Sequence, residues 1–387
     1  MLSKTKNIFT IYMCGLCLNI QNENKKKFEE IFVSFLVDKI IDEENKEIAK
    51  LRILSKFLNN VTPELFFDKI ISNCGRLLSR SSKNYEFFST VFIGADKIKY
   101  NDEFIKNTLF NEYKSFFFPT SFTSPGRTSN INQSFKNIAQ NCNLYLLLQQ
   151  ILNIDLDQNE QYTYSYNFIS RIFKIYATNK EVNTKYPLDE DLLINSLLYV
   201  VEKFDKIYHD SPEQKDFINY FFQTFLSSLY CIPKIKIDQN KQKDNISKLG
   251  STIKDLINNN TYSNYHNYFY LLPAITMEHF DFVYEDDISD LFYSLLENNC
   301  DAEITVENAA NILPLTTCSL NLSIKDNDFK SKSQEKLNKV FTNMVTSNLF
   351  TDNYNKLSHL DSICLYLICK FLAKGSFTED EVNHTIF

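Results

Sequence analysis

Glycine and proline are scarce in this chain, and that scarcity limits the folds it can adopt. The sequence contains 6 Gly and 8 Pro among 387 residues, whereas average usage would give about 27 and about 19. Hairpins and βα crossovers depend on tight turns that these two residues favour. We therefore expect few such turns, which disfavours an all-β sandwich, a large barrel or a doubly wound nucleotide-binding sheet.

The composition is that of a folded chain with no strong overall charge. Hydrophobic residues make up 44% of the sequence and charged residues 23%, so the chain can bury a sizeable core. A net charge of −7 gives no whole-chain attraction for nucleic acid or an anionic membrane. The excess of Asn, Lys, Ile, Phe and Tyr follows codons rich in A and T, which indicates an AT-rich genome.

Apolar residues recur at steps of three and four along almost the whole sequence, the pattern of amphipathic helices. Two segments also carry helix-start signals, namely Thr62-Pro63-Glu64 and the capping box of residues 211–214. The expected helices span residues 28–40, 48–58, 62–78, 101–117, 131–152, 162–177, 187–207, 212–230, 288–297, 306–313, 334–349 and 357–373, with Gly375 as a C-cap.

Many helices joined by short polar connectors are typical of stacked antiparallel helix pairs. The Gly, Trp and Thr-Pro-Leu-His landmarks of tetratricopeptide and ankyrin repeats are missing. We therefore predict an all-α protein, an irregular helical-repeat (α-solenoid, HEAT-like) array. Its expected parts are an N-terminal half over 1–231, a solvated Lys-rich linker over 232–248 and a C-terminal half over 249–387. A mobile surface loop is expected over 118–130.

Among the cysteines and histidines, the pair Cys14-x-x-Cys17 is the strongest candidate for a redox or metal site. That pair lies inside an apolar helical run without the preceding strand of a redox motif. Zinc would need a second pair, and Cys364 and Cys369 are distant and more widely spaced. Nine cysteines, an odd number, favour free buried thiols in a reducing compartment. The histidines are isolated, at positions including His209, His266, His279 and His359.

Two acidic clusters, residues 189–191 and 285–287, could bind a divalent cation or act as paired carboxylates. Both precede helical runs, where acids complement the helix dipole, and this structural interpretation is favoured. The sequence contains no GxGxxG, GxxxxGK[ST] or GxSxG motif. We therefore predict no catalytic, cofactor or metal site, and the sequence does not locate a partner surface.

A third kind of pattern suggests nucleic acid. Lysines 234, 236, 241, 243 and 248 could touch phosphates, and the tyrosines of 162–166 and 262–270 could stack on bases. Solvated lysines and tyrosines packed between helices are the favoured interpretation. An RNA-associated helical repeat is kept as an alternative.

The segment Leu51–Leu58 (LRILSKFL), after the amphipathic helix from Phe28, resembles the early Leu-Arg-x-x-x-Ser helix of PCI-type helical-repeat subunits. Within that class the likeness is to the M-subunit family of the eukaryotic translation initiation factor three complex. The resemblance covers about 60 residues, and residues 271–296 agree only in apolar spacing. It implies a subunit of a larger assembly. Members also carry a winged-helix module, which is not recognisable here, and no functional residue is carried over.

Taken together, these patterns predict a cytoplasmic, non-enzymatic scaffold that binds other proteins and has no integral membrane span. An alternative is a secreted or surface-delivered helical protein, because Lys4 and Lys6 precede the apolar run 8–18 as in a signal peptide. The mass of the mature N-terminus distinguishes the two, since a cleaved signal would remove roughly the first 20 residues.

Overall fold

The computed structural model describes residues 8–18, 24–41, 54–72, 85–118, 125–154, 160–210, 215–347 and 357–372. Every regular element among them is a helix, so the predicted all-α class is confirmed. In this described part of the chain, no helix is both long and apolar enough to cross a membrane. The chain divides into two compact units, residues 1–175 with 179–187, and residues 176–178 with 188–387.

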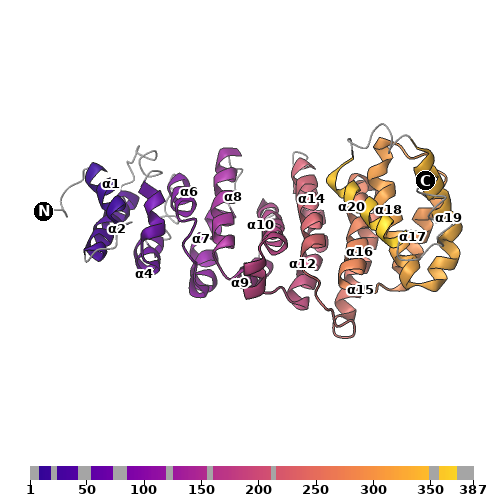
Figure 1. Ribbon diagram of the computed structural model, residues 1–387, viewed down its shortest axis with the longest axis horizontal. Coiled ribbons are helices and arrows are strands. Elements are labelled where there is room, and N and C mark those ends of the chain that lie inside the picture. The colour runs from indigo at the N-terminus through magenta and orange to yellow at the C-terminus, as the bar shows by residue number, and fades with distance from the viewer. Residues whose placement is uncertain are drawn as a thin grey trace. The chain divides into compact units, whose positions relative to one another are not determined.

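The first unit combines longer helices with short segments, several of them 3-10 or π-helical (indigo to magenta in Figure 1). Its elements are α1 (Ile8–Cys17), α2 (Lys25–Ile41), η2 (Lys56–Asn60), α4 (Pro63–Leu65), η3 (Phe66–Ile71), α6 (Tyr85–Gly94), η5 (Phe104–Leu109), α7 (Phe110–Phe117), α8 (Pro125–Gln140), α9 (Leu144–Leu152), most of α10 (Glu160–Thr178) and α11 (Lys180–Lys185).

The second unit has longer helices, up to the 20 residues of α18 and α19 (yellow end of the colour bar in Figure 1). Its elements are α12 (Glu190–Glu202), α13 (Phe204–Asp210), α14 (Lys215–Cys231), α15 (Lys243–Asn258), η7 (Asn260–Tyr265), α16 (His266–Phe280), α17 (Asp286–Asn299), α18 (Val306–Lys325), α19 (Asn327–Thr346) and α20 (His359–Phe371).

Within each unit, helices contact helices that lie about 45 residues away in the chain. In the first unit α6 packs on α8, and Asn137 donates to the Phe92 carbonyl, 45 positions away. In the second unit α16 packs on α18, and Asn321 donates to the Ala274 carbonyl, 47 positions away. This spacing matches the roughly 40–47 residues of a HEAT-type helix pair. It is compatible with the predicted helical-repeat array.

Aromatic rings fill much of the space between these helices. The ring of Phe222 on α14 stacks on Tyr268 of α16, with centroids 4.9 Å apart and planes at 9°. Phe204 meets the Phe269 ring edge-on at 5.0 Å. Each such ring removes a large apolar area from water and adds about 0.5–1.5 kcal/mol when paired. The abundance of Phe and Tyr therefore supplies the interior of this fold.

Proline positions correct two of the predicted boundaries. The expected loop over 118–130 is wrong from residue 125 onward, because Pro125 is the first residue of α8, where its fixed φ suits a helix start. The helix predicted over 306–313 continues through Pro314 to Lys325. Residues 312–323 are buried against neighbouring helices, and this packing outweighs the hydrogen bond that proline removes.

A helix cap that apolar periodicity does not reveal corrects another predicted boundary. The helix expected over 131–152 breaks at Asn143, whose side chain caps α9 by accepting from the Leu146 N–H at 3.3 Å. The helix expected over 212–230 is present as α14, whereas its predicted capping box lies outside the described residues. Gly375 also lies outside them.

The segment 232–248 lies wholly inside the second unit, and the boundary between units falls near residues 175–188. Ile232, Ile237 and Ile246 are buried, and α15 begins at Lys243. The Ile232 carbonyl contacts Nε2 of His279 at 2.5 Å. The lysines of this segment therefore surround a buried isoleucine pattern that anchors it to the helices of its own unit.

Substitution of Gly94 tests a close backbone contact in the first unit. A Cβ on Gly94 would lie 2.5 Å from the Ser55 Cβ and 2.6 Å from its carbonyl oxygen. Because backbone cannot yield cheaply, Gly94→Ala should lower the free energy of unfolding by about 1–3 kcal/mol in urea denaturation. Gly126→Ala is the control, since nothing lies within 4 Å of its Cβ. Equal effects from the two substitutions would contradict the close contact.

Candidate functional site

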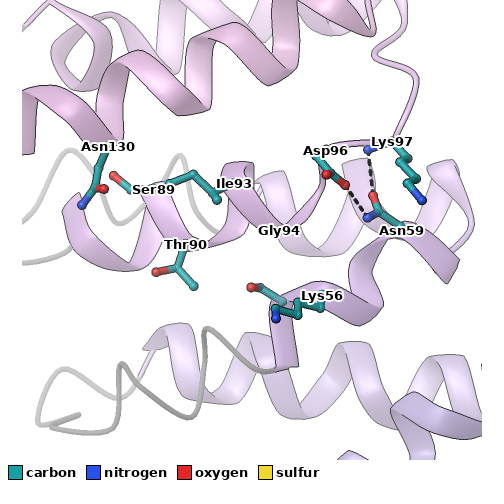
Figure 2. Close-up of a pocket in the computed structure, with 10 residues that line it drawn as sticks. Lys56, Asn59, Ser89, Thr90, Ile93, Gly94, Asp96, Lys97 and Asn130 are labelled. Atoms are coloured by element: carbon teal, nitrogen blue, oxygen red, sulfur yellow. Dashed lines mark hydrogen bonds between the residues drawn. The ribbon is translucent and has the colours of Figure 1, made fainter.

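An open groove on the first unit is the candidate site. It consists of two adjoining cavities, of about 550 and 520 Å³, that share Lys56, Asn59 and Lys97. The first cavity continues toward Ser89, Thr90 and Asn130, which lie at its other end in Figure 2. The second cavity extends to Tyr12, Leu16, Phe57 and Asn60. The groove thus combines ammonium, amide, hydroxyl and apolar groups.

The short helix η2 forms the floor of the groove, and two glycines hold it in place. On one side, the ring of Phe57 occupies the space beside Gly15 of α1, where a Cβ would lie 2.5 Å from the Phe57 Cδ2. On the other side, Ser55 just before η2 contacts Gly94 of α6. A side chain at either glycine would push η2 away from its neighbour. The position of Lys56 and Asn59 therefore depends on both glycines.

Asn59 ties η2 to the turn that follows α6. Its Nδ2 donates to Asp96 Oδ1 at 2.7 Å, and its Oδ1 accepts from the Lys97 N–H at 2.9 Å (Figure 2). The Asp96 carbonyl in turn accepts from Asn141 Nδ2 at 2.7 Å. These three bonds fix the turn from both sides, so that the Lys97 side chain is presented at the groove.

Amide side chains on α8 hold the end of α6, where backbone carbonyls lack helical partners. Asn137 is buried, and its Nδ2 lies 3.2 Å from the carbonyl oxygens of both Phe92 and Ile93. An unsatisfied buried carbonyl would cost about 1–3 kcal/mol. Asn137 and Asn141 therefore help to position the groove. The sequence alone does not distinguish them from asparagines on the surface.

Apolar side chains lie along one edge of the groove. Tyr12, Met13 and Leu16 of α1 are 38%, 43% and 37% exposed, whereas Cys14 and Leu18 are buried. The ring of Tyr12 meets Phe57 edge-on at 5.4 Å. Helix α1 thus has a buried face and a second apolar face open to solvent.

The two groove lysines are unpaired. Neither the Lys56 nor the Lys97 ammonium forms an ion pair with the described residues. In the second unit, by contrast, Lys241, Lys336 and Lys370 contact carboxylates at 2.7 Å or less. Sequence reasoning did not single out Lys56, Lys97 or Asn59. The only signal was that Lys56 falls inside the segment resembling PCI-type subunits, of which residues 51–53 lie outside the described part.

Burial makes several of the described cysteines unreactive, whereas Cys231 and Cys369 are exposed. Cys14 is buried on α1, and burial followed by the nearby Cys17 raises the pKa of its thiol. Burial also raises the pKa of Cys318 and Cys364. A raised thiol pKa suppresses the thiolate that nucleophilic or metal chemistry requires. In this part of the chain, no cluster of three or more His, Cys, Asp or Glu side chains is placed to hold a metal ion.

The histidines each contact local structure. His209 Nε2 lies 3.2 Å from Asp205 Oδ1, one helical turn earlier. His266 Nε2 lies 3.2 Å from the Asn259 carbonyl. His359 Nδ1 lies 3.3 Å from Ser227 Oγ. Burial lowers the pKa of His266 and of His279, so both are neutral hydrogen-bonding groups near pH 7.

The acidic cluster 189–191 stabilises the start of α12. Asp189 caps the helix by accepting from the Leu192 N–H at 2.8 Å. Glu190 accepts from the Asp238 N–H at 2.8 Å and from Lys241 Nζ at 2.7 Å, and Lys241 also contacts Asp191 at 2.9 Å. The Lys241 ammonium thus already neutralises these two carboxylates. In the second cluster, Asp287 contacts Lys254 at 3.3 Å.

The tyrosine clusters are mostly interior. Tyr162 and Tyr166 are buried on α10, and Tyr262, Tyr265 and Tyr268 are buried in η7 and α16. A base cannot stack on a ring that is already covered by other side chains. The main feature that suggested RNA binding is therefore part of the core.

Comparison with known proteins adds no assignment, since no protein-family model matches the chain and no curated protein is significantly similar to it in sequence.

Asn59→Asp tests the amide clamp of the groove. The change removes the donor to Asp96 and places two carboxylates together, so we expect a loss of about 1 kcal/mol of stability at pH 7. Part of the loss should disappear at pH 4, because one carboxyl then binds a proton and the repulsion falls. Denaturant titration at the two pH values measures it. Asn60→Asp carries the same charge change without the clamp and should have a smaller effect.

Glu190→Gln tests the link between the acidic cluster and the lysine-rich segment. The Asp238 N–H first, and Lys241 next, lower the pKa of Glu190. A lowered folded-state pKa gives stability that is present above the unfolded value and lost as pH falls. The variant should be less stable at pH 7 and should lose less between pH 5 and pH 3, as read from thermal unfolding. If the variant lost as much stability between pH 5 and pH 3 as the unmodified protein, Glu190 would not stabilise this link.

Proposed function

We propose that this protein is a non-enzymatic helical scaffold that binds a partner protein through the groove of its first unit. The observation that carries the proposal is the open apolar face of α1, with Tyr12, Met13 and Leu16. It lies next to Lys56 and Lys97, which form no ion pair within the part of the chain that the structure describes. Exposed apolar side chains that border a polar groove are typical of protein interaction sites. Helical stacks expose such surfaces without any catalytic motif.

Membership of a larger assembly of the PCI or translation-initiation type is a narrower form of this proposal. Its support is the set of buried apolar side chains on α2, namely Phe32, Val33 and Leu36, and the residues Leu54–Leu58 that follow it. Leu54 and Leu58 are buried and Lys56 is exposed, which is how a helix of that kind would pack. A cytoplasmic location belongs with this form, because such assemblies act there.

Photo-crosslinking tests the proposal directly. A photoreactive amino acid in place of Tyr12 should crosslink a specific protein in cells or extract of the native source. The crosslink should be lost when Lys56→Glu and Lys97→Glu are added. The same amino acid at Tyr220, a 59% exposed tyrosine on α14, is the control position and should not capture that protein.

Three other outcomes would count against the proposal. Absence of any crosslink above the Tyr220 background would remove it. Crosslinking to RNA instead of protein would favour the RNA-associated alternative. Loss of residues 12–16 from the mature protein, seen by mass spectrometry of its N-terminus, would support the secreted alternative and would delete this edge of the groove.

A further inference from the structure

The charges of the groove point to the chemistry of its occupant. Among the side chains that line the two cavities, the charged ones are Lys56, Lys97 and Asp96. The Asp96 carboxylate already accepts from the Asn59 amide at 2.7 Å. The groove is therefore a locally cationic site on a chain whose net charge is −7. Unlike charges across an interface steer association and set its specificity.

The pairing of lysines elsewhere in the protein strengthens this point. Lys241 contacts Glu190 at 2.7 Å, Lys336 contacts Glu297 at 2.7 Å, and Lys254 contacts Asp287 at 3.3 Å. Several lysines of the second unit thus receive carboxylates from neighbouring helices, whereas others, such as Lys234 and Lys236, are exposed and form no ion pair with the described residues. The groove presents two ammonium groups within reach of one site and supplies no such carboxylate from the described residues. A carboxylate from another molecule would complete the same arrangement.

The apolar edge adds a second requirement. Leu16 and Tyr12 border the cavity that also contains both lysines, and Met13 continues the exposed face. Burying a large apolar side chain there would contribute more to affinity than an exposed ion pair does. An occupant with both features gains affinity from apolar contact and selectivity from charge.

Nucleic acid fits these observations less well than an acidic peptide. Binding to a phosphate backbone depends on neutralising several phosphates at once, and the groove offers two lysines with a carboxylate between them in sequence. Tyr12 is the exposed ring, and its edge-on contact with Phe57 leaves part of it covered. Met13 and Leu16 have no base-stacking role.

We propose that the groove binds an acidic, amphipathic segment of a partner protein, with carboxylates at Lys56 and Lys97 and a large apolar side chain against Tyr12 and Leu16. This inference rests on the proposed function and specifies its partner. Asn60 also lines this cavity, and its amide can bond to the backbone of the bound segment, whereas the Asn59 amide is engaged with Asp96 and Lys97.

Fluorescence polarisation with synthetic peptides and the full chain tests the inference. The probe is a labelled peptide of alternating Glu and Leu, compared with versions in which Gln or Lys replaces Glu and Ser replaces Leu. The Glu–Leu peptide should bind at least about tenfold more tightly than each of the others at low salt. Raising the salt concentration should weaken it, because the lysines are exposed.

Charge reversal provides the matched control. The double variant Lys56→Glu, Lys97→Glu should bind the Glu–Leu peptide about tenfold less tightly and should gain affinity for the Lys–Leu peptide. Lys106→Glu with Lys136→Glu changes the net charge equally at exposed positions outside the groove, and should shift binding less than about threefold. Circular dichroism of both variants confirms that they remain folded.

The outcomes separate this inference from the proposed function. If the Glu and Gln peptides bound equally tightly, or if the two double variants lost the same amount of affinity for the Glu–Leu peptide, the inference of an acidic occupant would be wrong. If the Tyr12 crosslink to a protein still formed, the docking groove would stand with a partner of different chemistry. If neither the peptides nor the crosslink appeared, both proposals would fail. If a single-stranded oligonucleotide competed with the Glu–Leu peptide and bound more tightly, the occupant of the groove would be nucleic acid and not an acidic peptide.

Discussion

Side-chain hydrogen bonds from one helix to the backbone of another, about 45 residues away, underlie both units of this protein. Asn137 bonds to the carbonyls of Phe92 and Ile93, and Asn321 bonds to the carbonyl of Ala274. Amides can satisfy buried carbonyls without placing a charge in the interior. Packing between aromatic and aliphatic side chains supplies the driving force, and these bonds fix how neighbouring helices align.

The groove arises where this regular packing is interrupted. Helix η2 is a single 3-10 segment, and it fits between α1 and α6 because Gly15 and Gly94 leave room for Phe57 and Ser55. A short element cannot bury every side chain that it carries, so Lys56 and Asn59 remain at the surface. The contacts that stabilise the first unit therefore also create its cationic, partly apolar groove.

Helical periodicity predicted the fold class and many helices, because burial of one helix face places apolar residues at steps of three and four along the sequence. It located α2, α10, α14 and α20 to within a few residues. It failed where a residue has two possible roles. Pro125 starts a helix and Pro314 lies inside one, and only packing against neighbours separates these cases. The sequence also did not reveal the ion pairs of Lys241, because its partners Glu190 and Asp191 lie about 50 positions earlier.

The sequence by itself determined that this chain is helical, that its thiols and histidines form no recognisable catalytic motif, and that its aromatic residues belong at helix interfaces. These properties follow from local spacing. Only the tertiary structure decided where Lys56, Asn59 and Lys97 meet, and that Tyr12 and Leu16 lie beside them. Residues 12, 56 and 97 are brought together by helix packing, and their proximity depends on two glycines whose role is visible only when the backbones touch.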